Sequence, residues 1–123
     1  MGPRRPRTAA GRRLLDDLDE ALNDSAKESK KLLEWSEIEI KTLDMLGQTV
    51  DRAEDLRRVF DAERKGEGRP AMLVKISAEI RSLDRQISTF MAEIQVDSGP
   101  KVSSRHLKAA TARWDPARRA GEY

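Results

Sequence analysis

One regular apolar series limits the possible folds of this chain more than any other feature. Between residues 73 and 94, large apolar side chains recur at alternating intervals of three and four residues. They stand at Leu73, Ile76, Ile80, Leu83, Ile87, Phe90 and Ile94. This is the heptad spacing of a helix that packs along another helix. We therefore expect a long helix with a helical partner.

The partner is predicted in the segment that comes before. Ser36 and Glu39 form a capping box, in which each side chain bonds the other residue's amide, so a helix should begin there. Residues 65–69 contain two glycines and break the pattern, and Pro70 suits the first turn of a second helix. The chain is therefore predicted to be all-α, with a coiled-coil-like antiparallel hairpin over residues 36–97. The predicted seam residues of its first helix are Leu43, Leu46, Val50, Ala53 and Phe60, with Arg57 as the one polar position.

The hairpin core looks too thin to stand alone. Leu, Ile, Val and Phe together make up 25 of the 123 residues, and the chain has no Cys and one His, so disulfides cannot reinforce it. Small chains of this kind usually bury more surface by associating with copies of themselves. Apolar residues also widen the stripe of the first helix, at Ile38, Ile40, Leu56 and Val59, while Met72, Phe90 and Met91 are assigned to the core. We predict a ring-forming homo-oligomer larger than a dimer.

Two shorter regions precede the hairpin. Residues 1–11 are predicted to be a basic, extended and mobile arm, because the first seven residues contain two prolines and show no apolar periodicity. Residues 12–35 are predicted to be a short helical region. Thr8 can cap its first helix, a polar interruption follows at residues 23–25, and a second short helix anchored by Leu32 and Leu33 completes it.

A basic tail follows the hairpin over residues 98–123, where the heptad pattern stops. Its one helical patch places apolar side chains at intervals of three and four residues, flanked by cations, and such a helix can order against a partner protein. The alternative is that Trp114 folds back onto the hairpin end. The predicted partner-binding residues are Leu107, Lys108, Ala110, Arg113 and Trp114.

Positive and negative charges are segregated along the chain, although the net charge is only +2. Residues 1–13 carry five arginines and no acid, whereas residues 14–63 carry 15 acidic and seven basic residues. Residues 64–97 are nearly balanced, and residues 98–123 carry six basic and two acidic residues. A polyanion should therefore meet the ends of the chain, because the first half of the body repels it.

The arginines near the start favour contact with DNA phosphates, since five cations within ten residues have no compensating acid. A solubilising leader is the alternative for these arginines. Three lysines could extend the same surface, although Glu28 dilutes their charge and an ordinary solvated helix face would look similar. The predicted DNA-binding residues are Arg4, Arg5, Arg7, Arg12, Arg13, Lys27, Lys30 and Lys31.

No residue pattern predicts catalysis, a metal or a cofactor. Gly66 and Gly68 lack the strand and the motif of a phosphate loop and are interpreted as a turn. His106 lies near two serines in a polar tail without a scaffold to fix them. With no Cys, no stretch long enough for a membrane span and no signal-peptide core, the prediction is a non-enzymatic cytoplasmic protein without membrane contact.

Several weak motifs, in order along most of the chain, resemble the small subunit of the phage terminase found in phages of actinobacteria. They are Gly11-Arg12-Arg13, residues 35–39 leading into Leu43, Ala53 and Leu56, Arg69-Pro70 with Leu73, Val74 and Lys75, residues 79–81, and residues 109–114. The sequence departs from that family at Leu14 and Leu15, where an aromatic residue often stands. It also departs in the polar stretch 23–34, where a helix-turn-helix reader would lie.

The resemblance implies a ring-forming viral protein without an active site, acting in the host bacterial cytoplasm. Such a protein binds double-stranded concatemeric genome DNA and delivers it to the large terminase subunit, which holds the packaging ATPase and the nuclease. Two other functions fit the residues. One is a structural DNA-binding protein of a phage or nucleoid without a motor partner, and the other is a coiled-coil adaptor or scaffold whose basic arms bind acidic proteins.

Overall fold

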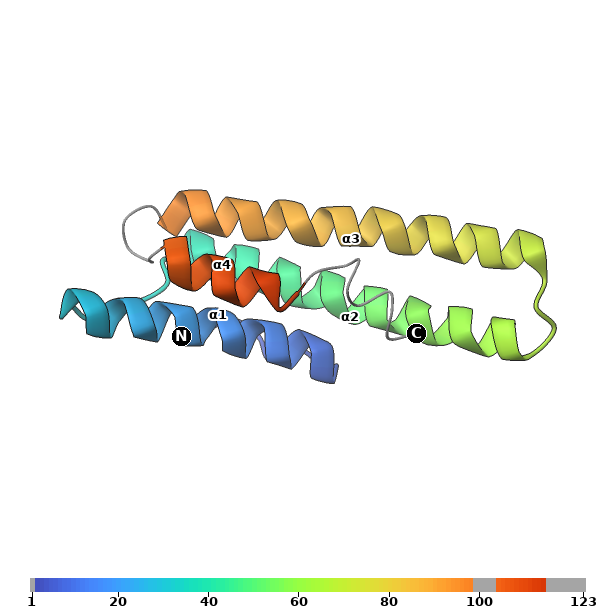
Figure 1. The fold of residues 1–123 in the computed structure, drawn as a ribbon, viewed down its shortest axis with the longest axis horizontal. Helices are drawn as coiled ribbons and strands as arrows, with labels where there is room; N and C mark the ends of the chain where they lie inside the picture. Colours follow the sequence, from blue (N-terminus) through green and yellow to red (C-terminus); the bar gives the residue numbers. More distant parts are fainter. Residues whose placement is uncertain (1, 99–103, 115–123) are drawn as a thin grey trace.

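The computed structural model describes residues 2–98 and 104–114, and all the regular secondary structure within these residues is helical. The helices are α1 (Ala9–Ser29), α2 (Glu37–Lys65), α3 (Pro70–Ser98) and α4 (Ser104–Ala112). α2 and α3 lie side by side as a long antiparallel hairpin, and α1 and α4 lie along the half of it that is farther from the turn (Figure 1). The all-α prediction is confirmed, and α2 and α3 occupy the residues predicted for the hairpin.

Local signals fix both ends of the hairpin helices. The Ser36 side chain accepts from the Glu39 amide at 3.2 Å, and the Glu39 carboxylate accepts from the Ser36 amide at 2.8 Å, as the capping box predicts. At the other end, Gly68 has a φ of 62°, a left-handed conformation that glycine adopts without strain. The predicted turn at Gly66 and Gly68 is therefore confirmed.

An ion pair closes this turn. The Glu63 carboxylate accepts from the Arg69 amide at 3.0 Å and from the Arg69 guanidinium at 2.7 Å. These hydrogen bonds from Arg69, first those of its side chain and then that of its amide, lower the pKa of Glu63 to about 2. The carboxylate therefore stays charged and holds the start of α3 against the end of α2.

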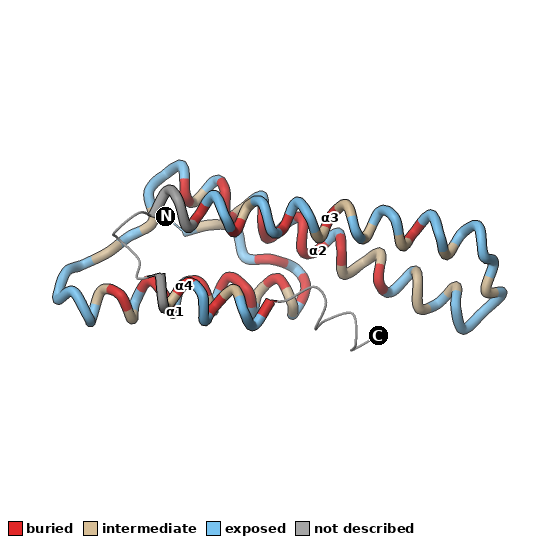
Figure 2. Tube along the Cα trace, turned by 45° about the horizontal axis from the view of Figure 1, so that its top comes forward, coloured by how far each residue is buried: buried red, intermediate tan, exposed pale blue. Residues whose placement is uncertain are grey.

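The core of the hairpin lies in the half that α1 and α4 cover. Figure 2 shows buried residues concentrated there and mostly exposed or half-buried residues towards the turn. The seam residues that are fully buried are Leu43, Leu46, Val50, Ala53, Ile76, Leu83, Ile87 and Ile94. Phe60, Leu73, Ile80 and Phe90 are only half-buried. Met91 is in the core as predicted, but Met72 is 37% exposed, which corrects its assignment to the core.

The polar position of the seam forms an ion pair within the hairpin. Arg57 is buried, and one of its guanidinium nitrogens donates to both carboxylate oxygens of Asp84 on α3, at 2.9 Å and 2.7 Å. A buried charge is costly unless it is paired and hydrogen-bonded. This pair thus replaces an apolar contact and fixes the register of α2 against α3.

The N-terminal helical region is one helix, so the predicted interruption at residues 23–25 is wrong. The Thr8 side chain caps α1 by accepting from the Gly11 amide at 3.1 Å, and the helix then runs to Ser29. Ser25 is buried, so packing overrides the weak helix propensity of this polar stretch. The predicted second short helix is also wrong, because residues 31–36 are not helical and Leu32 is 89% exposed.

The C-terminal helix α4 packs on the body of its own chain, chiefly on α1. Leu107, Ala110 and Trp114 are buried in the common core, so the prediction that they await a partner protein is wrong. This contact is flanked by an ion pair between Arg113 and Asp17 at 3.0 Å and by a hydrogen bond between His106 and Glu28 at 2.9 Å. Trp114 does fold back onto its own chain, as in the alternative prediction, but α4 packs chiefly on α1 and not on the hairpin end. The rest of the predicted tail, residues 99–103 and 115–123, lies outside the described residues.

We predict that Trp114 stabilises the body. Trp114→Ala should lower the free energy of unfolding by about 3–5 kcal/mol, because a large buried ring is replaced by a cavity. Chemical unfolding followed by circular dichroism measures this change. Lys108→Ala, at an exposed position of α4, is the control and should change little. Equal stabilities of the two variants would contradict the packing of α4.

Candidate nucleic-acid interface

The N-terminal arm, residues 2–8, is docked on the body instead of being mobile. Pro6 is buried between two glycines, Gly11 on α1 and Gly47 on α2. A Cβ added at Gly11 would lie 2.6 Å from Pro6 Cβ, and one at Gly47 would lie 3.0 Å from Pro6 Cγ. The absence of side chains at these positions therefore makes room for the proline. Residues 2–8 are non-helical as predicted, but residues 9–11 of the predicted arm belong to α1, and the mobility of the arm was predicted wrongly.

A buried carboxylate, Asp51 on α2, binds the backbone of the arm. Its Oδ2 accepts from the Arg7 amide at 2.8 Å, and its Oδ1 accepts from the Thr8 amide at 3.0 Å and from the Thr8 hydroxyl. Asp44, two turns earlier on α2, accepts from the Arg4 amide. Because Thr8 also caps α1, Asp51 links the arm, the start of α1 and the middle of α2.

Two arginine side chains of the arm form ion pairs with the body. Arg5 reaches Asp16 on α1, with nitrogen–oxygen distances of 2.9 Å and 3.4 Å, and Arg7 reaches Asp55 on α2 at 2.6 Å and 3.3 Å. These hydrogen bonds lower the pKa of Asp16 and of Asp55, and they raise the pKa of both arginines. The four side chains are 45–63% exposed, so solvent screens both pairs.

The other arginines differ in what they contact. Arg12 donates to the carbonyl oxygen of Arg7 at 2.7 Å and of Pro6 at 3.4 Å, so it braces the arm from α1. Arg4 and Arg13 are exposed. The five arginines that were predicted together as DNA-binding residues therefore differ in their contacts. Arg5 and Arg7 pair with carboxylates, Arg12 bonds the backbone of the arm, and Arg4 and Arg13 are exposed.

The three lysines lie at the opposite end of α1 from the arm. Lys27 is in the last turn of the helix, Lys30 caps it with a φ of 58°, and Lys31 follows, all exposed. Lys27 is 14 residues from Arg13, which is about 21 Å along a helix that rises 1.5 Å per residue. The structure therefore divides the predicted DNA-binding residues into an arm group and a lysine group.

The carboxylates that receive the arm were not predicted from the sequence, where the acids of residues 14–63 were expected only to repel a polyanion. A signal was present, because Asp44, Gly47, Asp51 and Asp55 recur at intervals of three and four residues and so lie on one face of α2. An acidic face of this kind next to a small residue suits a cationic, proline-containing segment. What the sequence did not supply was the pairing across more than 40 residues.

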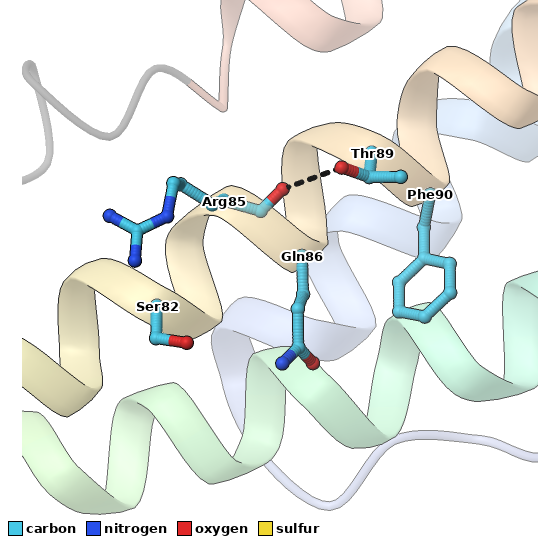
Figure 3. Close-up of a pocket in the computed structure, with 5 residues that line it drawn as sticks. All are labelled: Ser82, Arg85, Gln86, Thr89 and Phe90. Carbon is cyan, nitrogen blue, oxygen red and sulfur yellow. Dashed lines mark hydrogen bonds between the residues drawn. The ribbon is translucent and has the colours of Figure 1, made fainter.

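Other features of the structure suggest no chemistry of their own. An open hollow on α3 is lined by Ser82, Arg85, Gln86, Thr89 and Phe90, where the Thr89 hydroxyl donates to the Arg85 carbonyl oxygen at 3.0 Å (Figure 3). Among the described residues, no group of three or more His, Cys, Asp or Glu side chains is arranged to bind a metal. None of the described helices combines the length and the apolar character needed to cross a membrane.

Comparison of the chain with protein-family models, with curated proteins and with solved structures gives no match. The function of this chain is therefore inferred from its own residues and contacts and from its resemblance to the phage terminase small subunit.

We predict that Asp51 holds the arm in place. Asp51→Ala removes the acceptors of three hydrogen bonds, so it should release residues 2–8 and lower the free energy of unfolding by about 2–3 kcal/mol. Limited trypsin digestion of the native protein, with mass analysis of the N-terminal fragment, should show faster cleavage after Arg7. Gln48→Ala, on an exposed position of α2, is the control. Cleavage after Arg7 at equal rates in both variants would contradict docking by Asp51.

Proposed function

We propose that this protein is a small terminase subunit of a phage DNA-packaging motor. It binds viral genome DNA as a homo-oligomer in the host bacterial cytoplasm, delivers the DNA to the large ATPase and nuclease subunit, and regulates that subunit. The observation that carries the DNA-binding part is the fixed position of the cationic arm. Pro6 and Asp51 hold its backbone against the body, while the side chains of Arg4, Arg5 and Arg7, together with that of Arg13 on α1, stand at the surface.

A fixed arm is better suited to bind a duplex than a free one. The backbone of residues 4–8 is already ordered, so contact with phosphates has less conformational entropy to overcome. The arginines present several cations beside the middle of α2, within the acidic first half of the body, and they orient an approaching polyanion toward the arm. Contacts of this kind bind DNA without reading its sequence.

Exposed apolar residues on the hairpin support self-association. On α2, Ile38, Met45 and Val59 are 69%, 49% and 51% exposed, and they are separated by seven and 14 residues, so they share one helix face. This apolar stripe is distinct from the seam with α3. Large apolar side chains that recur on one exposed face indicate a contact with another helix.

The half of the hairpin next to the turn also carries apolar side chains that self-association would bury. α1 and α4 do not reach it, and its seam residues Phe60, Leu73 and Ile80 are only half-buried (Figure 2). Val74 on α3 is 67% exposed in this half. Neighbouring copies that pack against this half and against the apolar stripe would bury these side chains, as in a ring of hairpins.

The position of α4 changes how a large subunit could be engaged. Its apolar face is buried in its own chain, so the surface left for a partner is its polar side, where Lys108 and Arg113 are exposed. Arg113 already pairs with Asp17, so a partner contact there would be electrostatic and weak. We therefore propose that α4 presents charged groups to the large subunit.

One observation favours the adaptor as a second candidate. Arg5 and Arg7 already bind carboxylates in their own chain, and an acidic partner protein would offer the same group. Under that alternative the arm would bind an acidic protein, and duplex DNA would show no preference for it over the rest of the surface.

The salt dependence of DNA binding tests the proposal. Replacing Arg4, Arg5, Arg7 and Arg13 with Gln, and leaving the brace Arg12 in place, should reduce the slope of log K against log salt by roughly 3–4, at about 0.9 per phosphate. The matched control replaces Arg52, Lys75, Arg81 and Arg85, which are exposed cations of the hairpin. An equal change of slope in both variants would favour the adaptor. Stimulation of the large subunit's ATPase then separates a terminase subunit from a structural DNA-binding protein.

A further inference from the structure

We propose that Asp16 and Asp55 mask the arm, so that DNA phosphates must displace these carboxylates from Arg5 and Arg7 before the arm can bind. This inference rests on the proposed DNA-binding function and adds a form of regulation to it. The free protein would then show DNA only part of the positive charge that its sequence carries.

The arm has an anchored part and an exchangeable part. Its anchor is buried and consists of Pro6 between Gly11 and Gly47, together with the hydrogen bonds that the Arg7 and Thr8 amides donate to Asp51. None of these contacts uses the side chain of Arg5 or Arg7. The guanidinium groups of Arg5 and Arg7 can therefore change partners while the backbone of the arm stays where it is.

The carboxylates bind the arginines in the way that a phosphate would. Each guanidinium directs two nitrogens at the two oxygens of one carboxylate, Arg5 at Asp16 and Arg7 at Asp55. Phosphate oxygens accept the same paired hydrogen bonds. Asp16 and Asp55 thus occupy the guanidinium atoms that DNA would use.

The relative strengths allow exchange. Both ion pairs are exposed to solvent, and exposed pairs are weak. Duplex DNA carries one negative charge for about every 1.7 Å of its axis, so it surrounds the arm with many phosphates where the body offers single carboxylates. Isolated acidic groups would compete poorly with Asp16 and Asp55, while a duplex would compete well. The mask therefore selects for dense polyanions.

The two carboxylates also hold the side chains of the two arginines against different helices. Asp16 belongs to α1 and Asp55 to α2, with the arm between them. Release of both side chains would let them converge on neighbouring phosphates. Because Asp51 keeps the backbone docked, this change needs rotation of side chains and no unfolding of the arm.

The test compares two variants with the same change of charge. Asp16→Asn/Asp55→Asn removes the mask, and Glu37→Gln/Glu79→Gln removes two exposed carboxylates outside the arm's hydrogen bonds. In titrations of labelled duplex DNA at fixed salt, the unmasked variant should bind roughly three to ten times more tightly than the control variant, as expected for two exposed ion pairs. Circular dichroism checks that both variants keep the wild-type helix content.

A second comparison isolates the arginines. In a chain that already carries Arg5→Gln and Arg7→Gln, the Asp16→Asn/Asp55→Asn change should give no more than the control's gain, because nothing remains to be unmasked. Equal affinities of the unmasked and control variants, or a gain that persists without Arg5 and Arg7, would overturn the mask while leaving DNA binding intact. Absence of DNA binding by every variant and by the wild type would instead overturn the proposed function, and the mask with it.

Discussion

The seam between α2 and α3 is the contact on which the rest of this structure depends. It extends over both 29-residue helices and includes the buried pair of Arg57 and Asp84, which fixes one register. The remaining elements pack along only one half of it. α1 and α4 close the core at the end far from the turn, whereas the other half remains a two-helix structure with half-buried apolar side chains. Isolated two-helix segments bury little surface, so this half is where association with other copies would stabilise the fold most.

On the closed half, one carboxylate organises the start of the chain. Asp51 binds the arm and the cap residue Thr8, so the position of the arm, the start of α1 and its packing on α2 are set together. The polar contacts of the arm are of two kinds, buried and exposed. The buried contacts fix the backbone, and the exposed contacts to Asp16 and Asp55 engage two arginines without any role in fixing it. The arm, which we propose binds DNA, can therefore keep its place on the body while its guanidinium groups change partners.

The hairpin could be predicted from the sequence because its signals are local. The heptad series from Leu73 to Ile94, the capping box at Ser36 and the glycines of the turn each act within a few residues. The continuity of α1 could not be predicted, because packing of Ser25 outweighs the weak propensity of its neighbours. For α4, Leu107, Ala110 and Trp114 make the same pattern whether the face meets a partner or its own chain. The ion pairs of the arm join residues far apart in the sequence, and charge counts by segment do not reveal such pairs.

The claim that most of this account depends on is that the apolar stripe of α2 joins copies of the chain. Light scattering coupled to size exclusion, at micromolar concentration and moderate salt, measures it directly. The account predicts a single species of more than twice the chain mass of 13.9 kDa. It also predicts that Ile38→Glu/Val59→Glu, at positions exposed in the single chain, yields a helical protein of 13.9 kDa, while Gln48→Glu leaves the assembly intact. A wild-type chain that elutes as a 13.9 kDa monomer, or an assembly unaffected by both glutamates, would contradict it.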